Sequence, residues 1–176
     1  ETPYIIYDFG RLAVGYTDIQ YCTQKDICVT MHFDFSERIS DFDFDPQWEW
    51  SEVVKRLDIR QLLKADERSA FNLRRRAFRF VKIEFEKDNS LCIKNIRVKP
   101  CMYPSPKRGW FKSSDELLNK AWEVGKYTLH VNKQQEYESW PRNEMAFFSG
   151  DGYIDALVDL YVFGEDKLME SSLSLK

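Results

Sequence analysis

The chain has 176 residues, which is enough for one well-packed core or for two small ones. It carries 26 Lys and Arg against 29 Asp and Glu, and the resulting net charge of −3 gives no reason to expect nucleic acid as a partner. No apolar run approaches the ~18 residues of a membrane span, and the sequence shows no signal peptide. A start at Glu1 rather than Met suggests a processed, excised or engineered N-terminus. We therefore expect a soluble protein without a membrane partner, and the sequence does not distinguish the cytoplasm from the periplasm or the extracellular space.

The first hundred residues predict antiparallel β-structure. Alternating, β-rich segments predict strands at residues 3–7, 12–21, 27–35, 78–86 and 91–99. Asp8-Phe9-Gly10 marks a turn or bulge between the first two of them. Because these segments pair off as hairpins, we predict an accessory β-sandwich over residues 1–104.

A less regular insertion is expected at about residues 36–75. Within it, Ser51–Lys64 weakly suits a helix, with apolar residues at Val53, Val54, Leu57, Leu62 and Leu63. An acidic stretch before it holds several aromatic residues, namely Phe42, Phe44, Trp48 and Trp50. These rings could form a ligand surface, although packing on the sandwich is the more common role of such residues.

Prolines and a glycine predict a linker at residues 105–109, because proline excludes helix and interrupts a strand. Residues 110–176 then predict three helices. Ser113 and Glu116 have the spacing of a capping box at the start of the first helix. The second helix is expected at about residues 152–163 with Gly164 as its C′ residue, and the third at residues 165–175.

The first helix has an apolar stripe, and its glycine suggests a close neighbouring backbone. The stripe consists of Leu118, Ala121, Trp122, Gly125 and Leu129. Three amphipathic helices leave such stripes without partners, so we expect the natural chain to continue beyond Lys176. Other chains could also cover the stripes, which leaves a homo-oligomer or a protein-interaction module open.

The cysteines and histidines do not indicate a metal site or a cofactor. Cys22, Cys28, Cys92 and Cys101 contain no C-x-x-C pair, and the chain has two histidines. Cys22 and Cys28 flank a short turn, where a disulfide is the weaker alternative. We expect four reduced, mostly buried thiols.

The loop between the first two helices is the candidate site. It holds Glu136, Glu138 and Glu144 and leads to Gly150-Asp151. Carboxylates on a loop held between rigid helices suit acid–base chemistry on a sugar. Each could also be an ordinary exposed carboxylate, and Asp151 could be a helix N-cap.

Several segments together resemble the α-L-rhamnosidases, which are inverting glycoside hydrolases. The resemblance covers most of the chain except residues 36–75. Its segments are Asp8–Gly10 with Gly15, Tyr16 and Ile19; Arg76–Ile83; Ser114–Lys120 with Trp122, Glu123 and Tyr127–Leu129; and Gly150–Glu165. The resemblance implies a bacterial enzyme whose β-sandwich precedes an (α/α)6 catalytic barrel, of which residues 110–176 would be the first helices.

The loop matches part of the pattern of that family. The family has an acidic residue, x-P-x-R, a second acidic residue and a final W-x-G-D. Without gaps, the matching positions are Pro141, Glu144, Gly150 and Asp151, with Phe148 in place of the tryptophan. Ser139 and Asn143 occupy the positions of the first acidic residue and the arginine, while Glu138 and Arg142 lie one residue earlier.

The resemblance implies hydrolysis of terminal α-L-rhamnose from a glycan or glycoside, without a cofactor or metal. Glu144 would be the general acid, and Asp151, Glu138, Arg142 and Trp140 would contact the sugar. Trp140 could instead plug the barrel mouth. The catalytic base would lie in the remainder of the barrel, so this chain alone would be inactive. The departures at Ser139 and Asn143 leave a non-catalytic carbohydrate-binding or structural module as the alternative.

Overall fold

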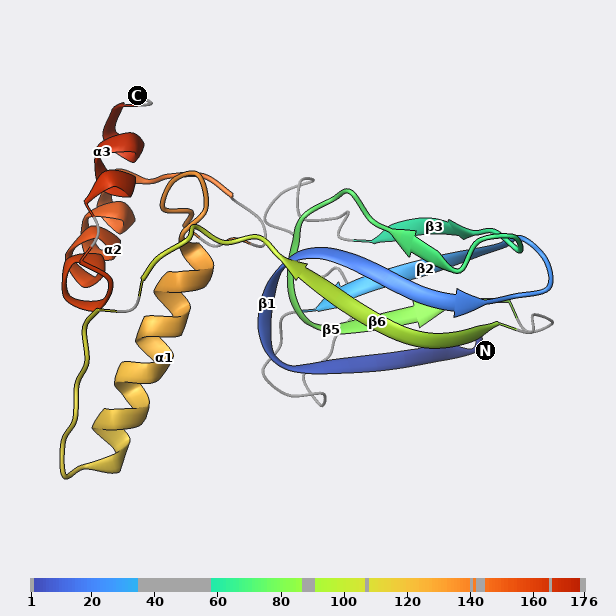
Figure 1. Cartoon of the computed structure of the whole chain (residues 1–176), viewed down its shortest axis with the longest axis horizontal. Coiled ribbons are helices and arrows are strands. Elements are labelled where there is room, and N and C mark those ends of the chain that lie inside the picture. Colours follow the sequence, from blue (N-terminus) through green and yellow to red (C-terminus); the bar gives the residue numbers. More distant parts are fainter. Residues whose placement is uncertain are drawn as a thin grey trace. The chain divides into compact units, whose positions relative to one another are not determined.

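The computed structural model describes residues 2–34, 58–86, 91–106, 108–139, 141, 145–164 and 166–174. The chain divides into two compact units, Glu1–Cys101 and Met102–Lys176. Among the described residues, the first unit contains the strands and the second the helices (Figure 1). The predicted order of β-structure followed by α-helices is therefore confirmed.

The strands of the first unit, called here the β unit, form a single antiparallel sheet. They are β1 (Tyr4–Cys22), β2 (Ile27–Asp34), β3 (Ile59–Leu63), β4 (Ser69–Phe71), β5 (Arg76–Glu84) and β6 (Cys92–Pro100). The order is β3-β2-β5-β1-β4, and β6 pairs with the second half of β1. The structure does not confirm the two separate sheets of a sandwich. Strand β1 pairs with β4, β5 and β6, and β5 pairs in turn with β2, so all the strands belong to one sheet.

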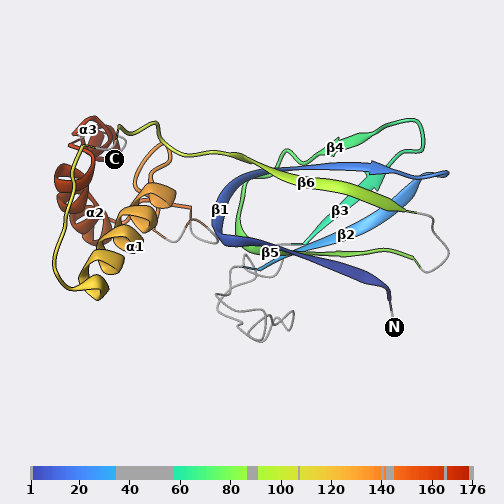
Figure 2. The same ribbon diagram turned by 60° about the horizontal axis from the view of Figure 1, so that its bottom comes forward.

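A sharp bend in β1 folds the sheet over its own core (Figure 2). Asp8 pairs with Phe80 of β5, but the next pair joins Ala13 to Phe78, so residues 9–12 lie opposite Arg79 alone. Gly10 has a φ of 75° and donates its N–H to Asp8 Oδ1 at 2.7 Å. The predicted bulge at residues 8–10 is confirmed. The strands expected at residues 3–7 and 12–21 are one bent strand, because β5 pairs on both sides of the bulge.

Alternate residues of the strands fill the core of the β unit, as strand periodicity requires. In the second half of β1, Thr17, Ile19 and Tyr21 are buried, whereas their neighbours Tyr16 and Asp18 are partly exposed. The fully buried apolar side chains of this core include Ile19, Tyr21, Val29, Met31, Leu63, Phe78, Val81 and Ile83. This continuous apolar interior stabilises the folded sheet.

The weak helix expected at Ser51–Lys64 is wrong for its described part. Residues 59–63 form β3, which pairs with β2 from Ile27–Leu63 to Met31–Ile59. Ile59 and Leu63 are buried and Arg60 and Leu62 are exposed, which is a period of two rather than a helical stripe. Phe42, Phe44, Trp48 and Trp50 lie outside the described residues.

The second unit, called here the helical unit, contains α1 (Glu116–Asn132), α2 (Ser149–Val162) and α3 (Lys167–Ser174). The predicted capping box is wrong. Asp115 is the N-cap of α1, and its carboxylate accepts the N–H of Leu117 at 2.8 Å. Ser113 lies outside the helix, where its Oγ accepts the N–H of Asp115 at 3.1 Å. Gly164 is the C′ residue of α2 as predicted, with a φ of 62° and its N–H bonded to Asp159 O at 2.9 Å.

The helices leave much apolar surface uncovered in this unit. In the predicted stripe of α1, Leu129 is buried but Leu118 is 50% exposed. A methyl group at Gly125 would meet no described atom within 4 Å, so the expected close backbone neighbour is absent from the described part of the chain. The large exposed apolar side chains of these helices are Leu117, Leu118, Val124, Tyr153, Ile154, Leu157, Leu160, Tyr161 and Leu173.

Candidate functional site in the helical unit

The segment between α1 and α2, residues 133–148, is called here the acidic loop. It contains two isolated antiparallel bridges. One pairs Lys133 with Tyr137 in a tight turn, and the other pairs Ser139 with Ala146 across the loop. The N–H of Ser139 donates to Ala146 O at 2.9 Å, and the N–H of Phe147 donates to Glu136 Oε1 at 3.2 Å. These bonds fix the base of the loop.

A buried ion pair fixes the acidic loop to α2. Lys133 Nζ lies 2.7 Å from the carboxylate oxygens of Asp159, and both side chains are fully buried. The hydroxyl of Tyr137 donates to Asp159 Oδ2 at 2.6 Å. The Asp159 carboxylate therefore binds both Lys133 and Tyr137, which lie at the two ends of a five-residue segment of the loop. These contacts form a buried hydrogen-bond network around the negative charge.

Aromatic rings surround the Lys133 ammonium. Its Nζ lies 4.6 Å from the centroid of the Phe163 ring and 5.4 Å from that of Tyr103. The N–H of Tyr103 also donates to the carbonyl oxygen of Lys133 at 2.7 Å. A desolvated cation at such distances gains about 2 kcal/mol or more from the faces of aromatic rings, which offsets part of its desolvation cost.

Of the three candidate carboxylates of this loop, Glu136 and Glu138 lie within the described residues, and Glu138 is the more buried. It is only 6% exposed, and its N–H donates to Asn132 O at 2.9 Å. Pro141 is also buried. Trp140, Arg142, Asn143 and Glu144 lie outside the described residues, so their predicted roles stay predictions. A buried carboxylate such as Glu138 requires polar partners.

Asp151 lies in the first turn of α2 and is exposed. The alternative that it caps this helix is wrong, because the N-cap is Phe148, which makes no side-chain cap bond. A carboxylate in the first turn is nevertheless favoured by the helix dipole. Asp155 follows one turn later, and burial, then the charges of Asp151 and Asp159, raise its pKa to about 6.

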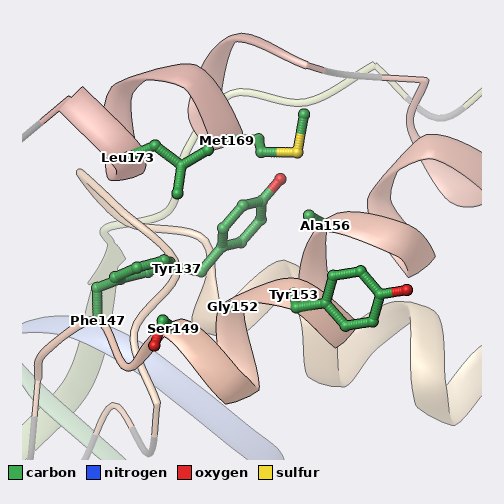
Figure 3. Close-up of a pocket in the computed structure, with 8 residues that line it drawn as sticks. All are labelled: Tyr137, Phe147, Ser149, Gly152, Tyr153, Ala156, Met169 and Leu173. Atoms are coloured by element: carbon green, nitrogen blue, oxygen red, sulfur yellow. The ribbon is translucent and has the colours of Figure 1, made fainter.

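An apolar pocket of about 270 Å³ lies beside the loop, between α2 and α3 (Figure 3). Tyr137 and Phe147 of the acidic loop project into it opposite Met169 and Leu173 of α3. Gly152 completes the wall, and a Cβ there would lie 2.1 Å from the Phe147 ring. Since its lining is almost entirely hydrocarbon, this pocket suits apolar side chains better than a sugar.

Among the described residues, no group of three or more His, Cys, Asp or Glu side chains lies close enough together to hold a metal ion. None of the described helices has the length and hydropathy needed to cross a membrane.

Lys133, Tyr137 and Asp159 were not identified from the sequence. One signal could have pointed to Asp159. The buried residues of α2 are Gly152, Ala156, Asp159 and Val162, and a carboxylate within such a stripe requires a buried partner. The identity of that partner depends on tertiary contacts across 26 residues of sequence.

When the chain is compared with known proteins, its matches are solved structures. No protein-family model and no curated protein matches the chain. Seven solved chains match it. A GH78 rhamnosidase of Bacillus sp. GL1 has a TM-score of 0.83 and 23% identity, over 97% of this chain and 17% of that one.

Two further solved structures give the same result. A rhamnosidase from Klebsiella oxytoca with rhamnose bound has a TM-score of 0.78 and 21% identity, over 99% of this chain and 36% of that one. An α-L-rhamnosidase from Dictyoglumus thermophilum has a TM-score of 0.70 and 16% identity, over 99% and 20%. The chain thus spans between about a sixth and about a third of these proteins. The resemblance to α-L-rhamnosidases is confirmed, and at these identities it establishes the fold.

Proposed function

We propose that the chain is part of an inverting glycoside hydrolase that releases terminal α-L-rhamnose from glycans or glycosides. The observation that carries the proposal is the likeness of 97–99% of the chain to three rhamnosidases, one of them solved with rhamnose bound. It is supported by the position of the acidic loop between two helices, where rigid elements can hold carboxylates in a fixed geometry.

Glu144 is the general acid in this proposal. Cleavage of a glycoside builds positive charge on the sugar and requires a proton on the leaving oxygen. An inverting enzyme places its acid and base about 6.5–9.5 Å apart, so that a water molecule fits between the base and the sugar. The base lies in the remainder of the barrel, and this chain contributes the acid half of the site.

Glu138, Arg142, Trp140 and Asp151 bind the sugar in this proposal. Carboxylates and a guanidinium suit the hydroxyls, and an indole ring suits a C–H face of the sugar. Glu138 is held next to the end of α1 by its main-chain hydrogen bond to Asn132. Asp151 is exposed in the first turn of α2, directly after the acidic loop, and is accessible to a ligand.

The proposed domain arrangement is a β accessory domain at residues 1–104, a linker at 105–109 and the first helices of an (α/α)6 barrel at 110–176. The exposed apolar side chains of α1 and α2 support it, since Leu117 is 72% exposed and Tyr161 is 76% exposed. Further barrel helices would cover such surface.

A second candidate is a carbohydrate-binding or structural module of a relative that has lost activity. Ser139 and Asn143 favour it, because they occupy positions where the rhamnosidase pattern has an acidic residue and an arginine. Sugar binding by the full-length protein without hydrolysis would support this second candidate.

The test is hydrolysis of aryl α-L-rhamnosides by the full-length protein and by its Glu144→Gln variant. The variant should lose about 10²–10⁴-fold in kcat on a substrate with a poor leaving group. It should lose much less on a substrate whose leaving group needs no proton. NMR of the first product should show inverted anomeric configuration.

Glu123→Gln is the matched control, since Glu123 is exposed on α1 and pairs with Lys126. It should keep full activity. Wild-type rates in Glu144→Gln would contradict the acid assignment. If no rhamnoside is cleaved by the unmodified protein, the binding-module candidate replaces the hydrolase.

A further inference from the structure

Two cysteines lie opposite each other at one end of the β1–β6 pair. Cys22 is the last residue of β1, Cys92 is the first residue of β6, and the antiparallel register pairs them directly. Seventy residues of sequence separate the two positions, so no spacing rule of the sequence indicates this pair. The disulfide alternative considered from the sequence, Cys22 with Cys28, has no such geometry, because Cys28 pairs with Leu62 of β3.

Both thiols lie on the outer face of the sheet, where a reagent can reach them. Tyr21, which precedes Cys22, is fully buried, so the side chain of Cys22 points to the opposite face. Cys92 is exposed and Cys22 partly exposed. The expectation of mostly buried thiols is therefore wrong, since Cys28 is exposed as well.

The register places the two thiols next to each other across the strand pair. The neighbouring Cys22 thiol raises the pKa of the Cys92 thiol. Directly opposed residues of antiparallel strands have Cα atoms about 4.5–5.5 Å apart. A disulfide needs about 4.4–6.8 Å between these atoms, so the bond can form without moving the strands.

We propose that Cys22 and Cys92 are a dithiol site that forms a cross-strand disulfide with a small-molecule disulfide as oxidant. One protein thiolate attacks a sulfur of oxidised glutathione and releases one glutathione thiolate. The second protein thiolate attacks the protein sulfur of this mixed disulfide and releases the other glutathione. Two protein thiols are oxidised, one glutathione disulfide is reduced to two thiols, and the two protons pass to the leaving thiolates.

The disulfide would join the start of β6 to the end of β1. The closed loop runs from Cys22 to Cys92 and includes β2, β3, β4 and β5. A cross-link of such a long loop removes much conformational freedom from the unfolded chain, so oxidation should stabilise the β unit. The raised pKa of the Cys92 thiol keeps it protonated at neutral pH, and the thiolate is the attacking species, so oxidation should be faster at alkaline pH.

The test equilibrates the chain with oxidised glutathione, quenches it with an alkylating agent and maps its peptides by mass spectrometry without reduction. The expected product is a Cys22–Cys92 linked peptide. The thermal midpoint of the β unit should rise by about 5–10 °C, and a thiol reductant should reverse this rise.

Three serine variants make the test specific. Cys28→Ser, the matched control at an exposed strand cysteine, should form the same linked peptide and show the same rise in midpoint. Cys22→Ser should form a glutathione adduct on Cys92, and Cys92→Ser should form one on Cys22. Neither variant should show a rise in the thermal midpoint. Separate glutathione adducts on Cys22 and Cys92 of the unmodified chain, or a link from either to another cysteine, would overturn the proposal.

Discussion

The β unit and the helical unit differ in which side chains they bury and which they expose. In the β unit, Phe78, Val81 and Ile83 are fully buried in a continuous apolar core. In the helical unit, the fully buried residues include the Lys133–Asp159 ion pair, while Leu117 and Tyr161 are largely exposed. The difference indicates that the β unit buries a larger apolar core, whereas the helical unit combines a small apolar cluster with a buried charge pair and exposes apolar helix faces suited to further packing.

The largest expected effect is the loss of a core ring from the β unit. Phe78 is fully buried and packs edge to face against Phe9 and Phe33, with centroids 5.4 and 5.0 Å away. Phe78→Ala removes this packing and leaves a cavity, so it should cost about 3–5 kcal/mol of unfolding free energy. This loss of unfolding free energy can be measured by denaturant unfolding that is monitored through hydrogen exchange of peptides from the β unit.

Leu117→Ala in the helical unit sharpens the same comparison. This side chain is 72% exposed, so its loss should change the free energy of unfolding by less than about 0.5 kcal/mol. A cost near that of Phe78→Ala would mean that Leu117 is covered in solution, which would refute the contrast between the two units.

The next effect concerns the buried charge pair. Lys133→Met leaves the Asp159 carboxylate buried with Tyr137 as its remaining hydrogen-bond donor among the contacts described above. Removal of one member of a buried pair should cost about 3 kcal/mol, because the other charge stays desolvated. The loss should appear as faster hydrogen exchange in the acidic loop and in α2.

A double variant separates the charge penalty from lost packing. Lys133→Met with Asp159→Asn removes both charges and should be less destabilising than the sum of the two single changes. Strict additivity of the three free energies would show that the two side chains do not interact, contrary to their 2.7 Å contact.

A smaller effect than the loss of the buried charge pair is a pH dependence of the helical unit. The folded pKa of Asp155, about 6, exceeds the unfolded value near 3.8, so between these values the folded state binds more protons than the unfolded state. Stability should therefore decrease as the pH rises from about 4 to about 6, by roughly 1–2 kcal/mol after allowance for partial exposure. Above this window the contribution of Asp155 should be constant.

Asp155→Asn tests this origin of the pH dependence. The variant should be more stable than the unmodified chain at neutral pH and should lose most of the decrease between pH 4 and pH 6. An unchanged pH profile of α2 unfolding, measured by circular dichroism or hydrogen exchange, would assign the dependence to other groups.

The acidic loop shows how far the sequence led toward the candidate site. The helical spacing of apolar residues on both sides predicted that the loop lies between two helices. The end of the apolar pattern of α2 predicted Gly164 as its C′ residue. The ion pair that fixes the loop to α2 could not be predicted, because Lys133 and Asp159 are 26 positions apart and the stripe of α2 indicates a buried partner for Asp159 without identifying it. The capping box failed for a local reason, since Asp115 competes with Ser113 for the same role.

The sequence by itself determined the local structure: the alternating strands, the glycine bulge in β1, the three helices and the division into a β unit and a helical unit. Hydrophobic period and turn chemistry act over a few residues, so they can be read from the sequence directly. Tertiary structure alone decided that residues 59–63 are a strand, that Cys22 meets Cys92 and that Lys133 meets Asp159. Those outcomes depend on register and on burial between distant segments, where the free energy of contact outweighs local preference.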